Sequence, residues 1–373
     1  MSSSHARLRF NPHFASLPHY NAGMSDAEAG RASAGRGLVR LASNENPYGP
    51  SPAAIAEVAA MAAAVWRYPE GKADALRAAI AAHAGLAIDR VVAGNGSEAL
   101  IAALSRAFLE PGAEVVTVAP SFGLHEIEPL AQGARVVKVA MTPALEFDVA
   151  ALRDAIAAGP RLVFLSSPSN PVGSTLSRED LARLLAAVPR GTVFVLDEAY
   201  AEFRRDADAF DPLALALAAE VDFVTLRTFS KAYGLAGLRI GYALASSAQV
   251  AALMQAALTP FNVNAAAQRA AVAALADEPF MRATVATIAA ERDRLAAALV
   301  ARGYAVARSE ANFLFFDARR EADGIAAALL REGVIVKPWT EAGYTRFVRV
   351  TVGRPEHSEA FLAALDRVAR PAG

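Results

Sequence analysis

The sequence predicts an α/β protein with a mostly parallel central sheet in a large domain and a smaller α+β domain. Between about residues 90 and 245, short apolar runs alternate with segments of helical periodicity, which is typical of parallel strands connected by helices. These runs are rich in Val, Ile, Leu and Phe without polar alternation, as in strands buried on both faces. With 373 residues, the chain is longer than one hydrophobic core usually supports, so two domains are expected.

Seven strands are expected in the large domain, with helices between them that begin near Ser or Asp. The strands are RVVAG (90–94), EVVTVAP (114–120), ARVVKVA (134–140), RLVFLSS (161–167), TVFVLDE (192–198), VDFVTLRT (221–228) and LRIGYALA (238–245). The helices include SEALIAALSRAFL (97–109), DVAALRDAIAA (148–158) and REDLARLLAAV (178–188). Because ligands gather at the carboxyl ends of parallel strands, polar motifs at these ends are candidates for the site.

A break at TPFNVN (259–264) is expected to end the large domain. We predict an N-terminal arm over residues 1–35 that joins the small domain, a large domain over 36–262 and a small domain over 263–373. The small domain is expected to contain a long helix and three strand-like segments. These are AERDRLAAALVARGY (290–304), NFLFFDA (312–318), VIVKPW (334–339) and RFVRVTVG (346–353).

Composition excludes several classes of function. The formal net charge is −1, with acids and bases interspersed, so we expect neither nucleic acid nor an anionic membrane as a partner. The chain has no cysteine, which excludes disulfides and thiolate catalysis, and its six histidines show no pair at metal-ligand spacing. Its apolar runs are too short to span a bilayer and its start has no signal-peptide pattern, so a cytoplasmic enzyme is expected.

The motif GNGSEAL (94–100) follows a predicted strand and opens a helix. Gly94, Gly96 and Ala99 fit a loose dinucleotide-binding pattern, but that pattern needs an acid about 20 residues later, and the next strand ends without one. What remains is a helix start whose free amide groups favour a phosphate. This motif alone also permits a nucleotide-binding protein.

Three more polar motifs lie near strand ends: SSPSNPVG (166–173), LDEAYAEF (196–203) and TLRTFSKAYGLAGLRIGY (225–242). Singly, Lys231 is typical of an exposed lysine, Asp197 of a helix cap, Asn170 of a turn and Arg239 of a surface arginine. Together they supply an amine for an aldehyde, a carboxylate for a pyridine nitrogen, donors for a ring hydroxyl and an arginine for a phosphate. Pyridoxal 5'-phosphate has these four features.

The motifs resemble those of the fold type I pyridoxal-phosphate aminotransferases, most closely the histidinol-phosphate aminotransferase branch. The likeness covers nearly the whole chain, and NENPYGP (44–50), RYPEG (67–71) and VRVTVG (348–353) extend it beyond the strand ends. The resemblance implies a homodimer with shared active sites. It also implies transfer of the amino group of histidinol phosphate to 2-oxoglutarate, giving imidazole acetol phosphate and glutamate in histidine biosynthesis.

The resemblance further implies roles for individual residues. Lys231 would bind the cofactor aldehyde and then act as general base, and Asp197 would keep the pyridine nitrogen protonated. Asn170 and Tyr200 would hydrogen-bond the ring oxygen. The cofactor phosphate would be held by Gly96, Ser97, Glu98, Thr228, Ser230 and Arg239, and across the dimer interface by Tyr68. The substrate would be contacted by Tyr20, Asn46, Lys337 and Arg349.

Two positions depart from the family pattern. His125 stands where a second aromatic residue, three after Phe122, is expected to stack on the cofactor ring. Lys337 stands where histidinol-phosphate enzymes commonly have an arginine, and lysine keeps the charge without the bidentate fork. These departures leave two alternatives open: an aromatic amino-acid aminotransferase, or a pyridoxal-phosphate-dependent decarboxylase of a phosphorylated amino acid.

Overall fold

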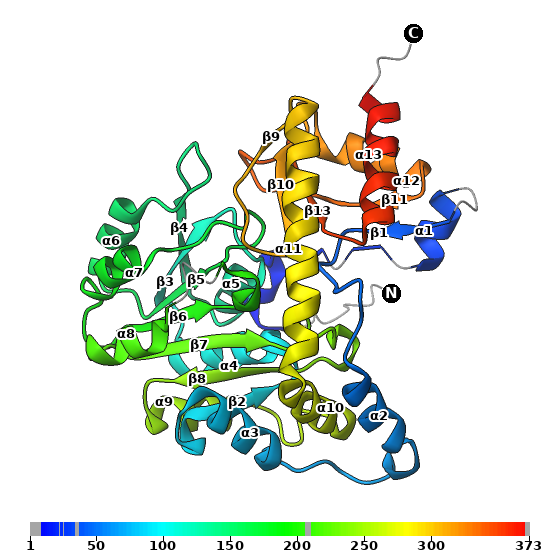
Figure 1. The fold of residues 1–373 in the computed structure, drawn as a ribbon. Helices are drawn as coiled ribbons and strands as arrows, with labels where there is room; N and C mark the ends of the chain where they lie inside the picture. Colours follow the sequence, from blue (N-terminus) through cyan, green and yellow to red (C-terminus); the bar gives the residue numbers. More distant parts are fainter. Residues whose placement is uncertain (1–8, 22, 25, 34–36, 206–209, 370–373) are drawn as a thin grey trace, which may run out of the picture.

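The computed structural model describes residues 9–21, 23–24, 26–33, 37–205 and 210–369. Among these residues, seven strands form the large sheet in the order β2–β8–β7–β6–β5–β3–β4, and all but β8 run in one direction (Figure 1). Their bounds are β2 (Val91–Gly94), β3 (Glu114–Ala119), β4 (Arg135–Ala140), β5 (Leu162–Ser166), β6 (Val193–Asp197), β7 (Phe223–Thr228) and β8 (Gly241–Ala245). The predicted mostly parallel sheet and its strands are confirmed.

Helices cover both faces of this sheet, which explains why its central strands are mostly apolar. One face carries α4 (Gly96–Phe108), α5 (Leu124–Ala131) and α9 (Ala248–Ala257). The other carries α3 (Asp74–Ala84), α6 (Val149–Ala157), α7 (Arg178–Leu185), α8 (Pro212–Ala218) and α10 (Ala265–Ala276). Side chains alternate along a strand, so Asp197 shares the face of Val193 and Val195, which pack in the cluster with α4 and α5.

The smaller part contains an antiparallel sheet in the order β12–β13–β10–β9, and a parallel pair, β1 with β11. Their bounds are β1 (Val39–Arg40), β9 (Ala305–Val306), β10 (Phe313–Asp317), β11 (Val334–Ile335), β12 (Lys337–Pro338) and β13 (Phe347–Thr351). The helices here are α1 (Asp26–Ala32), α11 (Glu278–Ala301), α12 (Ala322–Arg331) and α13 (Pro355–Ala369). The predicted smaller α+β part is thereby confirmed.

Several segments connect the two parts. The long helix α11 contacts both η4 (Ala201–Phe203) and the small sheet, and Figure 1 shows it running beside β10 and β13 of that sheet. Helix α10 packs on α2 (Pro52–Ala60) and α3, while β1 joins the small part. The exact division at residue 262 stays a prediction. Of the predicted arm, residues 1–8, 22, 25, 34 and 35 lie outside the described residues.

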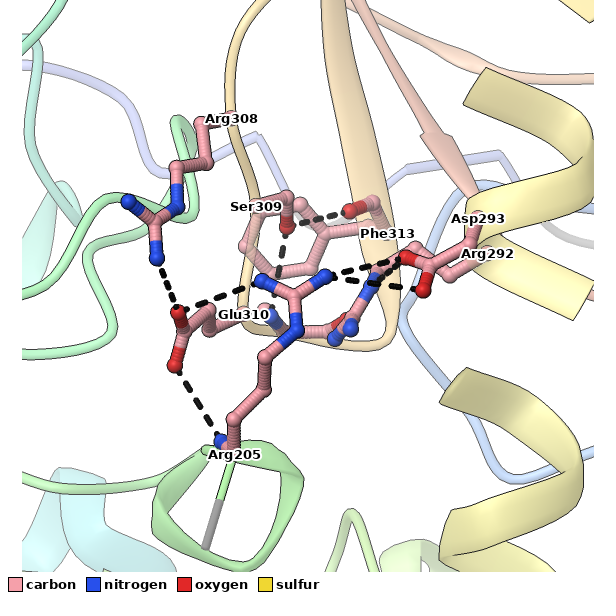
Figure 2. Close-up of polar contacts among 8 residues, drawn as sticks. Arg205, Arg292, Asp293, Arg308, Ser309, Glu310 and Phe313 are labelled. Carbon is pink, nitrogen blue, oxygen red and sulfur yellow. Dashed lines mark hydrogen bonds and ion pairs between the residues drawn. The ribbon is translucent and has the colours of Figure 1, made fainter. Parts of the chain in front are cut away.

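A buried glutamate holds the two parts together (Figure 2). Glu310 is 1% exposed and accepts hydrogen bonds from the Arg205 N–H at 3.3 Å and the Arg308 guanidinium at 3.0 Å. Its own N–H donates to the Gly173 carbonyl at 2.9 Å. Gly173 has φ +95°, and a Cβ there would clash with the neighbouring Ser309. The segment that leads into β10 therefore fixes the loop after β5.

No helix in the described part of the chain is long and apolar enough to cross a membrane.

Candidate active site

A cavity of about 540 Å³ lies at the carboxyl ends of the parallel strands. Four strands, β3, β5, β6 and β7, each contribute one polar residue near this edge: Thr117, Ser166, Asp197 and Thr228. Helix α4 begins at the same edge, and the small part closes the cavity with Lys337 and Arg349. The fold thus brings together most of the residues that the sequence motifs predicted. In the described residues, no group of three or more His, Asp or Glu side chains could hold a metal ion.

Lys231 lines the cavity three residues after β7. Its Nζ donates to the Ser43 carbonyl at 3.0 Å and lies 6.0 Å from the centre of the Tyr200 ring. Burial lowers the pKa of Lys231 to about 8, and the charge of Arg349 acts in the same direction. The neutral amine is the nucleophilic form, so this environment prepares Lys231 to react with an aldehyde near neutral pH.

The loop that carries Lys231 is fixed by a close approach of two backbones. Gly234 has φ +70°, and a Cβ there would lie 2.4 Å from the Gly49 backbone, so only glycine fits. The Asn46 side chain donates to the Ala232 carbonyl at 2.9 Å. Asn46 therefore supports this loop from outside the cavity, and the structure does not place it in the wall where we expected a substrate contact.

The start of α4 forms one end of the cavity. Gly96 has φ +77°, and a Cβ there would lie 2.6 Å from Arg239 Nη2. Arg239 Nη2 donates to Glu98 Oε2 at 3.0 Å. Hydroxyl groups line the same cavity from Ser97, Thr228 and Ser230. Free amide groups, hydroxyls and a guanidinium together make a site for an anion such as a phosphate.

Asp197 ends β6 and is 4% exposed. It accepts a hydrogen bond from the Ala199 N–H at 3.0 Å, and His125 Nε2 lies 3.3 Å from its Oδ2. His125 is fully buried and stacks on Phe164 with ring centres 5.3 Å apart. We expected the His125 ring to stack on a cofactor, but the structure places it behind the carboxylate. Phe122 is the aromatic residue of this segment that lines the cavity.

His125 belongs to a chain of polar contacts that sequence reasoning missed. Its Nδ1 lies 3.3 Å from Ser121 Oγ, which lies 3.4 Å from Thr117 Oγ1. A buried carboxylate is unfavourable without hydrogen-bonding partners. The chain therefore orients the His125 ring and, through it, Asp197.

Arg349 on β13 is a buried cation, 7% exposed. Its Nη1 donates to Asn170 Oδ1 at 2.6 Å and its Nη2 to the Ala42 carbonyl at 2.5 Å. The guanidinium lies 5.4 Å from the centre of the Phe313 ring. Among the described residues, its Nε has no hydrogen-bond partner and no carboxylate forms an ion pair with it. Burial lowers its pKa.

Lys337 lies directly opposite Arg349 in the β12–β13 pair. Its Nζ donates to the Asn21 carbonyl at 2.5 Å. Burial lowers the pKa of Lys337 to about 8, and Arg349 adds to this effect. Two neighbouring cations held by neutral oxygen atoms form a natural site for an anionic substrate group.

Tyr200 and Asn44 form another part of the wall. The Tyr200 hydroxyl accepts a hydrogen bond from Asn44 Nδ2 at 2.9 Å, and burial raises the pKa of Tyr200 to about 12. Asn44 has φ +56° and also accepts from Thr351 Oγ1 at 3.1 Å. Sequence reasoning missed Asn44.

Tyr20 lines the cavity and packs edge-to-face on Phe122, with ring centres 6.0 Å apart.

Tyr68 is another predicted residue that this chain does not bring to the cavity. It is 84% exposed and stacks on Phe261 with ring centres 4.9 Å apart. Val65 and Trp66 beside it are 73% and 74% exposed.

Known proteins resemble the chain over nearly its full length. The sequence profile of the class I and II aminotransferases matches residues 36–365. Histidinol-phosphate aminotransferase 1 of Mesorhizobium japonicum is 44% identical over 349 residues, covering 94% of this chain and 95% of that protein. An aromatic amino acid aminotransferase of Rhodococcus jostii is 40% identical over 328 residues, covering 88% and 89%.

A solved structure agrees with these relatives. Histidinol-phosphate aminotransferase from Sinorhizobium meliloti, in complex with pyridoxal-5'-phosphate, superposes with a TM-score of 0.89 at 29% identity. The match covers 98% of this chain and 99% of that one. The fold, the lysine in the cavity and the family match lead to one conclusion: the chain is an enzyme of the class I and II aminotransferase family.

Proposed function

We propose that this aminotransferase uses pyridoxal 5'-phosphate to move the amino group of histidinol phosphate to 2-oxoglutarate, giving imidazole acetol phosphate and glutamate. The observation that carries the proposal is the pair Arg349 and Lys337 in the cavity that holds Lys231. The two cations are adjacent, and neither has a carboxylate partner in the part of the chain that the structure describes. A phosphate dianion matches both charges. The names of the Mesorhizobium and Sinorhizobium proteins support this donor.

A second donor class deserves testing because of one relative. The Rhodococcus jostii protein that is 40% identical is an aromatic amino acid aminotransferase. An aromatic amino acid presents one carboxylate and would engage Arg349 alone.

The residues of the cavity fit the proposed cofactor. When bound, pyridoxal 5'-phosphate supplies an aldehyde and a protonated pyridine ring that withdraws electrons from the α-carbon of the substrate. Lys231 would hold the aldehyde, and Asp197, oriented by His125, would keep the ring nitrogen protonated. Arg239 and the start of α4 would hold the phosphate. Tyr200, protonated because its pKa is about 12, would donate to the ring oxygen.

Lys231 would transfer the proton after the incoming donor has displaced it and left the lysine amine free. With a pKa of about 8, a useful fraction of the amine is neutral at physiological pH and takes the proton from the α-carbon as general base. Asn170 fixes the guanidinium of Arg349, which orients the donor. In the return half-reaction, a carboxylate of 2-oxoglutarate would replace the donor's anionic group at Arg349.

We also propose a homodimer with shared active sites. Support comes from the exposure of Tyr68, which is 84% exposed. Val65 and Trp66, which precede it, are also largely exposed although their side chains are apolar. Several large apolar side chains exposed in one short segment are typical of an interface, and Tyr68 would reach the cofactor phosphate in the partner.

The first prediction concerns the pH dependence of the lysine amines. In the apoprotein, Lys231 and Lys337 should react with acetic anhydride with apparent pKa values of about 8, because the depressed pKa leaves each amine neutral at lower pH. Lys138 serves as the comparison, because its pKa is raised. Burial lowers the pKa of Lys138, but the neighbouring Glu126 and Glu341 raise it by more. Competitive labelling between about pH 6 and 11, read by mass spectrometry, separates them. Titration of Lys231 at the ordinary 10.5 would contradict the site.

The second prediction identifies the donor. Lys337→Ala should lower kcat/KM for histidinol phosphate by about 10- to 100-fold, since one charge-assisted contact to the phosphate is lost. The value for phenylalanine should change little, and so should both values in the control Lys72→Ala. Arg349→Ala should lower both by about 30-fold or more. If phenylalanine is the better donor and Lys337→Ala is indifferent, the aromatic function stands instead.

The third prediction tests the shared sites. Tyr68→Ala and Lys231→Ala proteins should each be nearly inactive, whereas mixed dimers should regain activity, because one of their two sites keeps both residues. Activity is measured after unfolding and refolding the two chains together, with heterodimers counted by differential tags. Heterodimers without activity would show that Tyr68 acts within its own chain.

A further inference from the structure

The active-site cavity also contains acidic side chains that the proposed roles do not use. Glu126 on α5, Lys138 on β4 and Glu341 after β12 all line it. Lys138 Nζ lies 3.1 Å from Glu126 Oε2 and 3.3 Å from Glu341 Oε1. The side chains are 29%, 35% and 23% exposed in this order, so they are neither buried core nor free surface. Two carboxylates share one ammonium, which leaves one net negative charge.

The rest of the cavity has the opposite charge. Arg349 is more than nine-tenths buried, faces the cavity, and keeps an Nε without a hydrogen-bond partner in the described residues. Lys337 stands opposite it in the strand pair. Along the same segment come Trp339 and then Glu341, so one wall passes from a cation through an indole ring to a carboxylate. The Trp339 indole N–H donates to Glu341 at 3.3 Å, which fixes both side chains.

We propose that Glu126 and Glu341 form the subsite that recognises the cationic heterocycle of the amino donor. The cavity then selects a molecule with a dianion at one end and an imidazolium at the other. This inference rests on the proposed function, because the donor's phosphate must occupy Arg349 and Lys337 for its ring to meet the carboxylates. Trp339 offers the ring an apolar face.

The same cluster excludes uncharged rings. A phenyl ring placed against it would remove water from carboxylates without giving them a hydrogen bond, which is unfavourable. An imidazolium donates N–H groups to the carboxylate oxygen atoms, and such charge-assisted hydrogen bonds are among the stronger ones in proteins. Lys138 tunes the subsite, because it neutralises half of the carboxylate charge.

The test compares two donors on the holoenzyme, with 2-oxoglutarate as acceptor in both cases. Glu126→Gln and Glu341→Gln keep the shape and remove the charge, so each should lower the ratio of kcat/KM for histidinol phosphate to that for phenylalanine by about 10-fold or more. Lys138→Gln should raise the ratio, since both carboxylates then face the ring unshared. Glu128→Gln is the matched control: Glu128 lies on the same helix but does not line the cavity, and its ratio should stay that of the wild type.

The outcomes separate this inference from the donor assignment. Suppose that the wild type prefers histidinol phosphate. If Glu126→Gln and Glu341→Gln then lower kcat/KM equally for both donors, or leave the ratio unchanged, the subsite alone is overturned. A lower ratio of kcat/KM in Lys138→Gln than in the wild type would also overturn the subsite. This variant keeps the test decisive if a glutamate variant folds poorly. A wild type that uses phenylalanine but not histidinol phosphate would overturn the proposed function together with the subsite.

Discussion

The buried guanidinium of Arg349 governs the electrostatics of the active site. A buried cation is expensive unless it is paired, yet this one is held by an amide oxygen of Asn170 and the carbonyl of Ala42. Its charge acts together with burial to lower the pKa of both Lys231 and Lys337 to about 8. One residue would thereby attract an anionic substrate, and its charge helps to keep the Lys231 amine neutral.

The fold holds this arginine from both of its parts. Arg349 comes from the small antiparallel sheet, whereas Asn170 follows β5 of the large sheet. Glu310, through Gly173, fixes the loop after β5 against the segment leading into β10, whose Phe313 packs under the guanidinium. The polar network around the buried Glu310 in Figure 2 therefore helps to fix Arg349 relative to Asn170. Packing outside the cavity therefore helps to decide where the proposed anion site lies.

Sequence reasoning located the residues whose position follows from a strand end. Asp197 closes an apolar strand and Lys231 follows another, so a parallel sheet necessarily brings them to one edge. The role of His125 could not be found this way, because the phase of a short helix decides whether it faces the cavity or Asp197. Asn44 lines the cavity and Asn46, for which a substrate contact was expected, does not, since the backbone has a positive φ at Asn44 that the sequence did not reveal.

Contacts across long sequence separations were beyond prediction altogether. Lys138 and Glu341 are 203 residues apart, and only the docking of the small part on the large one makes them neighbours. The proposed role of Tyr68 illustrates another limit, because a single chain cannot display a contact that would be made with a partner.

The most direct test of the account is the thermal stability of Arg349→Met. If Arg349 is held unpaired for a ligand, replacing it with a linear apolar side chain removes an unfavourable buried charge. The holoenzyme of the variant should then unfold at the same or a higher temperature than the wild type, at one scan rate, while aminotransferase activity is largely lost. A melting temperature several degrees below that of the wild type would contradict the account, because it would make Arg349 a structural residue.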